Sequence, residues 1–145
     1  MNDDTQDGPH VTFRFPVLIR EAHLDTFGHV NNAVYFELLE EARWEFITTR
    51  GYGMDKIRES AVGPTILGFD DVRFLKELRL RQEVFIESQM MSYTKKIGML
   101  RQDILDDAGT LYFRSRVVLG LFDTRARKLL PPSPEWLDAI GIVTA

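Results

Sequence analysis

The chain contains no cysteine. Disulfide bonds, thiolate metal sites and a cysteine nucleophile are therefore excluded. It also has no uninterrupted apolar run near the roughly 18 residues that a membrane-spanning helix needs, so we expect no membrane partner. Residues 1–10 are polar and acidic and lack the basic-then-apolar order of a secretory signal. These absences predict a cytoplasmic protein.

The chain also has fewer basic than acidic residues. The 18 lysine and arginine residues face 22 aspartate and glutamate residues, which gives a formal net charge of −4 over 145 residues. Nucleic-acid-binding proteins normally carry a basic surface, so we expect no nucleic-acid partner. A hydrophobic fraction of 44% and a charged fraction of 28% are typical of a globular protein. We predict a disordered tail over residues 1–11 and a single domain over residues 12–145.

Apolar periodicity predicts an α+β fold. Residues 12–22 alternate with period two and predict a half-buried strand, and residues 33–50 predict one long helix. The apolar stripe of this helix consists of Tyr35, Leu38, Leu39, Ala42 and Phe46. Further strands are predicted at residues 65–75, 83–93, 97–105 and 111–122, and a terminal helix near residues 136–140. This order indicates an antiparallel sheet wrapped around one central helix, and the open edges of such a sheet favour a homo-oligomer.

A polar loop leads directly into the predicted helix, in the segment HLDTFGHVNNAVYFELLEEARW over residues 23–44. Asp25 lies three residues before Gly28, and His29 and the pair Asn31–Asn32 follow. A carboxylate is thereby placed beside a helix N-terminus, whose backbone N–H groups favour negative charge. A base next to an oxyanion-binding pocket is most of what acyl transfer to water requires. The segment therefore predicts a hydrolase site.

Simpler interpretations of these residues remain open at this stage. Asn31 and Asn32 are also good helix caps, and Gly28 also suits a tight turn. His29 fits a hydrogen bond to substrate or to Asp25 as well as a packing role. The spacing of His23, Asp25 and His29 permits a metal site without indicating one, and we predict no metal and no organic cofactor.

The motif D-x-x-G-H-V-N-N-A-x-Y over residues 25–35 and the order of elements resemble the hotdog-fold acyl-CoA thioesterases of the 4-hydroxybenzoyl-CoA thioesterase type. The longer segment 23–44 is similar in particular to the bacterial long-chain acyl-CoA thioesterases of that group. The resemblance implies a hotdog fold and hydrolysis of an acyl-CoA thioester to a free acid and CoA, in lipid metabolism. It also implies a homodimer or a dimer of dimers with acyl-CoA at the subunit interface.

The resemblance assigns roles to residues of the motif. Asp25 is the implied catalytic carboxylate, acting as nucleophile or general base, and the backbone amide of Asn32 is the implied oxyanion donor. The implied substrate-binding residues are Gly28, His29, Asn31, Asn32 and Tyr35, although Tyr35 also fits the apolar stripe. Other hotdog thioesterases use a helix glutamate instead, which keeps Glu37, Glu40 and Glu41 as alternatives.

The substrate is less closely defined by the sequence. His29 and Asn31 stand where the benzoyl-type branch has apolar or aromatic residues, which disfavours a hydroxybenzoyl group and leaves a medium or long aliphatic chain. The basic residues open as ligands of the CoA phosphates are Arg73, Lys95, Lys96, Arg125, Arg127 and Lys128. The alternatives are an acyl-carrier-protein thioesterase and a non-catalytic acyl-CoA-binding hotdog module.

Overall fold

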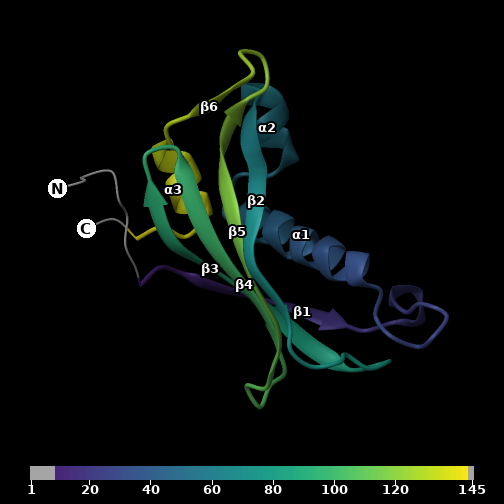
Figure 1. Cartoon of the computed structure of the whole chain (residues 1–145). Coiled ribbons are helices and arrows are strands. Elements are labelled where there is room, and N and C mark those ends of the chain that lie inside the picture. Colours follow the sequence, from purple (N-terminus) through teal and green to yellow (C-terminus); the bar gives the residue numbers. More distant parts are fainter. Residues whose placement is uncertain (1–8, 144–145) are drawn as a thin grey trace.

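The strands form one antiparallel sheet in the order β1-β3-β4-β5-β2, with β6 beside β5, and α1 lies against one face of it (Figure 1). The computed structural model describes residues 9–143. The elements are β1 (Thr12–Leu18), a 3₁₀ turn η1 (Glu21–His23), α1 (Asn32–Thr49), α2 (Met54–Ser60), β2 (Val62–Phe74), β3 (Glu83–Thr94), β4 (Ile97–Leu105), β5 (Leu111–Asp123), β6 (Lys128–Leu130) and α3 (Pro134–Ala139). The predicted α+β fold with a sheet wrapped around one long helix is confirmed.

The apolar stripe predicted for the long helix is its buried face. All five stripe residues are at most 6% exposed, and Ile47 joins them at 5%. The stripe packs against the inward side chains of the sheet, among them Ile86, Ile104 and Phe113. Because this burial removes apolar area from water along the whole helix, it fixes both the rotation and the position of α1 on the sheet.

The first strand is shorter than predicted. The sequence predicts a strand over residues 12–22, whereas β1 ends at Leu18 and residues 21–23 form η1. Leu18 pairs with Glu83, the first residue of β3, and Arg81 before it turns with a φ of 63°. Because the chain turns away before Glu83, β1 has no strand among the described residues to pair with beyond Leu18. The β1–β3 pairing therefore ends there, and the chain continues through η1 into the loop before α1.

Residues 10 and 11, which the sequence assigned to the tail, are hydrogen-bonded to the C-terminal segment of the fold. Residues 1–8 of the predicted tail lie outside the described part of the chain. Val11 donates its backbone N–H to the carbonyl of Gly141 at 2.9 Å, and His10 Nδ1 accepts from the N–H of Val143 at 3.0 Å. These bonds join residues 10–11 to the segment after α3. Within residues 9–143, no helix is long and apolar enough to cross a membrane.

A side-chain cap fixes the beginning of α1. Asn31 is extended, and its side-chain Oδ1 accepts a hydrogen bond from the N–H of Ala33 at 2.9 Å. This is the N-cap geometry, which supplies an acceptor to one of the free N–H groups of the first turn. The cap therefore determines where the helix begins and which of its amides remain open.

Replacement of Asn31 tests this cap. We expect Asn31→Ala to lower the free energy of unfolding by about 0.5–2 kcal/mol, because the N–H of Ala33 loses its acceptor. Asn31→Asp keeps an acceptor oxygen and should unfold close to wild type. Urea unfolding followed by far-ultraviolet circular dichroism measures both. Equal stabilities of the alanine variant and the wild type would show that the cap contributes nothing.

Candidate active site

The loop between η1 and α1 is closed by backbone hydrogen bonds. Leu24 and Val30 form an isolated bridge, and the N–H of Asp25 donates to the carbonyl of His29 at 2.8 Å. Inside this closure the N–H of Gly28 donates to the carbonyl of Asp25 at 3.1 Å. Gly28 has a φ of 82°, which glycine adopts without strain, so it serves the tight turn.

The carboxylate of Asp25 is held by this loop through one of its oxygens. Oδ1 accepts from the backbone N–H of Phe27 at 2.9 Å and from that of His29 at 3.2 Å. Oδ2 has no hydrogen-bond partner among the described residues. The side chain is exposed to solvent. Asp25 thus presents one oriented, open carboxylate oxygen at the surface.

The first turn of α1 leaves one amide open. The N–H of Ala33 is bound by the side chain of Asn31 and that of Val34 by its carbonyl, at 2.9 Å each. Within residues 9–143 the N–H of Asn32 has no hydrogen-bond acceptor. An open N–H at the positive end of an 18-residue helix is a site for a negatively charged oxygen.

An open groove of about 430 Å³ begins at this helix terminus. Its walls include His29, Asn32 and Tyr35 from the predicted site, together with Phe74 at the end of β2. Burial raises the pKa of the Tyr35 hydroxyl, and the charge of Glu77 acts in the same direction. Tyr35 therefore remains a neutral phenol at neutral pH, with its ring stacked on Phe113 at a centroid distance of 5.1 Å.

The groove contains two charged residues that the sequence did not single out. His29 Nδ1 forms an ion-pair contact with Glu77 Oε1, and Lys76 lines the same groove. Both residues follow β2, almost 50 positions after the loop of Asp25. No local spacing relates the two segments, which come together only in the folded chain.

The helix glutamates and the basic residues that the sequence offered as further site candidates do not line this groove. Glu37 and Glu41 are exposed on α1, away from the groove, while Glu40 lines a different cavity. Arg73 forms an ion pair with Asp71, its Nε lying 2.8 Å from Oδ1. Lys95 and Lys96 lie in the turn that follows β3. Arg125 and Arg127 lie between Asp123 and β6, Lys128 is the first residue of β6, and Asp123 pairs with Val62, the first residue of β2.

Those basic turns lie far from Asp25 within one chain. The loop of Asp25 follows β1, whose last residue pairs with the first residue of β3. The 12 residues of β3 then lead to the opposite end of the sheet, roughly 35 Å away at about 3.3 Å per residue. Lys95, Lys96 and the basic residues of the second turn therefore do not border the Asp25 loop of their own chain.

The candidate metal ligands have other partners. His23 Nδ1 accepts the N–H of Arg20 at 2.9 Å, and His29 Nδ1 contacts Glu77. Asp25 Oδ1 is occupied by two N–H groups. Among the described residues no cluster of three or more histidine, cysteine, aspartate or glutamate side chains is arranged to hold a metal ion.

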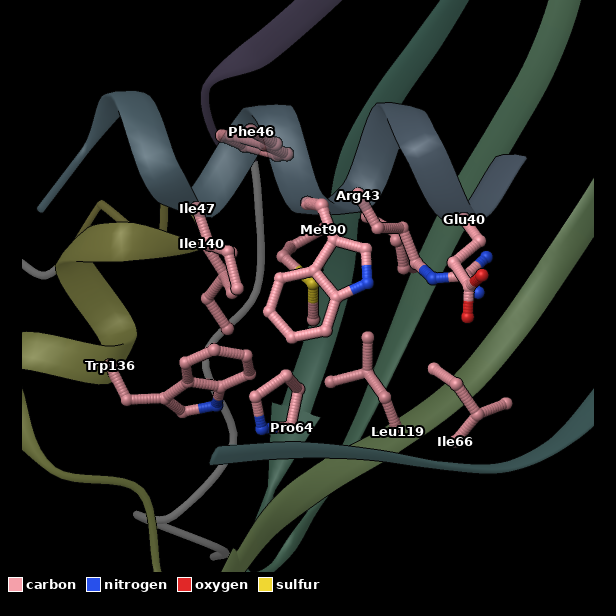
Figure 2. A pocket seen from close by; sticks show the side chains of 12 residues that line it. Glu40, Arg43, Phe46, Ile47, Pro64, Ile66, Met90, Leu119, Trp136 and Ile140 are labelled. Carbon is pink, nitrogen blue, oxygen red and sulfur yellow. The ribbon is translucent and has the colours of Figure 1, made fainter. Parts of the chain in front are cut away.

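A second cavity, of about 110 Å³, lies farther along α1 (Figure 2). We call it the inner cavity. Its walls come from the second half of α1, the beginning of β2, the central strands and α3, and they are mostly apolar. Its charged residues are Glu40 and Arg43, which lie together at one end in Figure 2, while Trp136 and Ile140 lie at the other.

The comparisons with known proteins agree with this architecture. The long-chain acyl-CoA thioesterase FadM of Escherichia coli K12 is 27% identical over 115 residues, which cover 79% of this chain and 86% of that protein. The structure of YbaW, a probable thioesterase of E. coli, aligns with a TM-score of 0.75 at 25% identity, covering 87% of this chain and 94% of that one. A Staphylococcus aureus protein solved in complex with CoA aligns with a TM-score of 0.82 at 17% identity, covering 90% and 82%.

The family assignment rests on most of the chain. Residues 17–140 match the thioesterase-like superfamily, which includes every element from the end of β1 to α3. The hotdog fold expected from the resemblance is therefore confirmed. The chain belongs to the thioesterase-like superfamily and is a thioester hydrolase.

Proposed function

We propose that this protein hydrolyses acyl-CoA thioesters to a free acid and CoA, with Asp25 as the catalytic carboxylate. The observation that carries the proposal is the state of the loop: Oδ1 of Asp25 is fixed by two N–H groups, which leaves Oδ2 oriented and open. Two residues after the Leu24–Val30 bridge closes this loop, α1 presents the open N–H of Asn32. FadM acts on long-chain acyl-CoA, and the S. aureus protein binds CoA, which supports CoA as the thiol carrier.

The chemistry follows from these two groups. Oδ2 attacks the thioester carbonyl as nucleophile or removes a proton from an attacking water as general base. In both routes negative charge develops on the carbonyl oxygen, and the N–H of Asn32 stabilises it. The carbon–sulfur bond then breaks and CoA leaves as a thiolate. In the general-base route this step gives the free acid, whereas in the nucleophilic route a water then hydrolyses the acyl anhydride of Asp25 to the free acid and the carboxylate. Because the pKa of an alkyl thiol is only about 8.5, this leaving group needs no dedicated general acid.

The groove at the helix terminus supplies contacts for the rest of the substrate. Lys76 is the cation in its wall and suits a phosphate of CoA, and Tyr35 and Phe74 offer aromatic surface, with their rings edge to face at 4.9 Å. Glu77 orients His29 through its Nδ1, which leaves Nε2 of the ring for a polar contact with the substrate.

The two cavities suggest where a long acyl chain lies. The groove and the inner cavity are both lined by α1 and β2, at opposite ends of the line of contact between these elements. Between them the rings of Phe36 and Phe69 meet edge to face at 5.0 Å. We assign the inner cavity to the distal part of a medium or long aliphatic chain, which passes this aromatic pair.

Asp25→Asn tests the catalytic assignment. The amide oxygen of asparagine still accepts the N–H groups of Phe27 and His29, so the loop should keep its shape. We expect thiol release from acyl-CoAs of two to eighteen carbons to fall by about 10²–10⁴-fold, because the base or nucleophile is lost. A thiol reagent measures the release, and Asp55→Asn, an exposed aspartate on α2, is the matched control.

Each outcome of this assay has a clear meaning. Near-normal turnover by the Asp25→Asn variant would remove Asp25 from the mechanism. Absence of thiol release from every CoA ester by the wild type would exclude an acyl-CoA thioesterase and favour an acyl-carrier-protein thioester or a non-catalytic binding module.

We also propose that two copies of the chain associate over β2. The edge strands of the sheet are β1 and β2. β1 is protected by Pro16, which cannot donate a hydrogen bond, and by exposed Arg14. β2 and the residue after it instead expose an apolar row consisting of Ile66, Leu67, Phe69, Phe74 and Leu75, each between 37% and 49% exposed. Such a row on an edge strand marks an interface.

A lysine at Leu67 tests this interface. Leu67 is 46% exposed, so the folded chain tolerates the change, whereas a second copy would have to bury the charge. We expect the wild type to sediment with the mass of at least two chains and Leu67→Lys to sediment as a monomer. Ile97→Lys, at a site 39% exposed in β4, is the control and should stay associated. A monomeric wild type would refute the interface.

A further inference from the structure

Arg43 is an unusual residue for the wall of an apolar cavity. It lies on α1 one turn after Glu40, and most of the other residues around the inner cavity are aliphatic or aromatic. Burial lowers the pKa of its guanidinium, while the charge of Glu40 opposes this shift. An arginine remains charged even so, and a charge placed in apolar surroundings is costly unless it has a partner.

A buried hydrogen-bond network holds the Arg43 side chain in place. Its Nη1 donates to Oε1 of Gln102 at 2.9 Å. Gln102 is fully buried on β4, and its Nε2 donates to the carbonyl of Leu39 at 3.1 Å and to Oγ of Ser88 at 3.0 Å. The amide of Gln102 is therefore fixed by the helix and by β3, and it fixes the guanidinium in turn.

This network does not itself require a charge. Gln102 offers Arg43 only a neutral oxygen, and a neutral donor would satisfy that oxygen equally well. Among the described residues Arg43 has no carboxylate within ion-pair distance, although Glu40 is on the same side of the cavity (Figure 2). An N–H donor and a carboxylate acceptor thus stand near each other without being joined.

The polar and apolar residues of the inner cavity follow one another in a defined order along its wall. Glu40 precedes Arg43 on α1, so this polar end faces the catalytic terminus of the helix. Met90, Leu119 and Trp136 line the wall farther on (Figure 2). An occupant that arrives from the catalytic end therefore meets a donor and an acceptor first and an apolar wall afterwards.

We propose that Glu40 and Arg43 form a binding site for a hydroxyl group in the middle of the acyl chain. The hydroxyl oxygen accepts from the Arg43 guanidinium and its hydrogen is donated to the Glu40 carboxylate, while the chain beyond it fills the apolar end. The preferred substrates are then mid-chain hydroxylated acyl-CoAs. This inference rests on the acyl-CoA thioesterase function proposed above and names the substrate class of that site.

The position of the hydroxyl follows from helix geometry. Glu40 and Arg43 lie eight and eleven residues after Asn32, which is about 12–16 Å along the helix axis at 1.5 Å per residue. An extended alkyl chain with C–C bonds of about 1.5 Å advances roughly 1.25 Å per carbon. Because the carbonyl is carbon 1, a thioester held at Asn32 therefore brings approximately carbons eleven to fourteen beside the two charges.

Binding can be measured without turnover, because both tryptophans of the chain, Trp44 and Trp136, line the inner cavity. The Asp25→Asn protein would be titrated with octadecanoyl-CoA and with its 10-hydroxy, 12-hydroxy and 3-hydroxy derivatives, followed by tryptophan fluorescence. We expect the 12-hydroxy ester to bind about tenfold or more tightly than the unsubstituted ester, since hydrogen bonds to charged groups are strong, and the 10-hydroxy ester, whose hydroxyl falls just short of the site, to gain less. The 3-hydroxy ester should gain nothing.

Two variants connect this preference to the proposed residues. Glu40→Ala and Arg43→Met should each reduce the preference for the mid-chain hydroxyl to within about twofold. Glu45→Ala, which is exposed on α1, and Arg58→Met, which is exposed on α2, are the matched controls and should keep it. Because Arg43→Met also removes a partner of Gln102, Glu40→Ala provides the test that leaves this network intact.

The outcomes separate this inference from the proposed function. Equal binding of the hydroxylated and unsubstituted esters, or a preference that survives in Glu40→Ala, overturns the hydroxyl site while thioesterase activity of the wild type stands. Failure of the wild type to release thiol from any of these esters overturns the proposed function instead. Fluorescence that does not respond to any ester overturns the assignment of the inner cavity as the acyl site.

Discussion

The packing of α1 against the concave face of the sheet is the interaction on which both candidate sites depend. Its buried stripe includes Leu39 and Ala42, both 0% exposed, so the helix can neither rotate nor slide without opening a cavity in the core. The first turn of this fixed helix carries the open amide of Asn32, and its middle carries Glu40 and Arg43. The proposed reaction site and the inner cavity therefore keep a constant separation, as selection of a substrate by its length would require.

The loop of Asp25 reaches this helix through bonds that do not depend on burial. The bridge of Leu24 with Val30 closes the loop, and the N–H of Asn31 donates to the carbonyl of His23 at 3.0 Å. Only Val30 in this loop is buried, at 5% exposure. The loop can thus stay exposed and accessible to water while its carboxylate keeps a defined orientation, because backbone hydrogen bonds supply the rigidity that packing supplies elsewhere.

Local features of the chain were predictable from the sequence because local physics determines them. The helical spacing of Tyr35 and Phe46 predicted α1 to within one residue at each end, and the terminal helix predicted near residues 136–140 is α3, which begins at Pro134. The cap role that Asn31 allowed as an alternative is realised. The end of β1 was predicted wrongly, since Leu18 stops the strand only because β3 begins at Glu83.

The contacts that the sequence could not predict are those that join distant segments. His29 meets Glu77 only because the chain that follows β2 returns to the Asp25 loop, and no periodicity relates residue 29 to residue 77. Gln102 likewise falls on an otherwise apolar face of β4, where its position alone would suggest a minor irregularity in a strand. Its meaning becomes visible only when α1 brings Arg43 within 2.9 Å.

A second side of α1 is also apolar. Trp44 and Ile47 lie off the five-residue stripe, and their spacing favours a helix that is covered on more than one side. In the structure both residues line the inner cavity with Glu40 and Arg43, at positions i, i+3, i+4 and i+7. One helix thus presents two stripes, one packed in the core and one that lines the inner cavity.

A stripe that served stability alone would have been packed with aliphatic side chains, because a cavity and a desolvated charge both cost free energy. The retained space and the retained charge together are what a binding site for an oxygen-bearing chain needs.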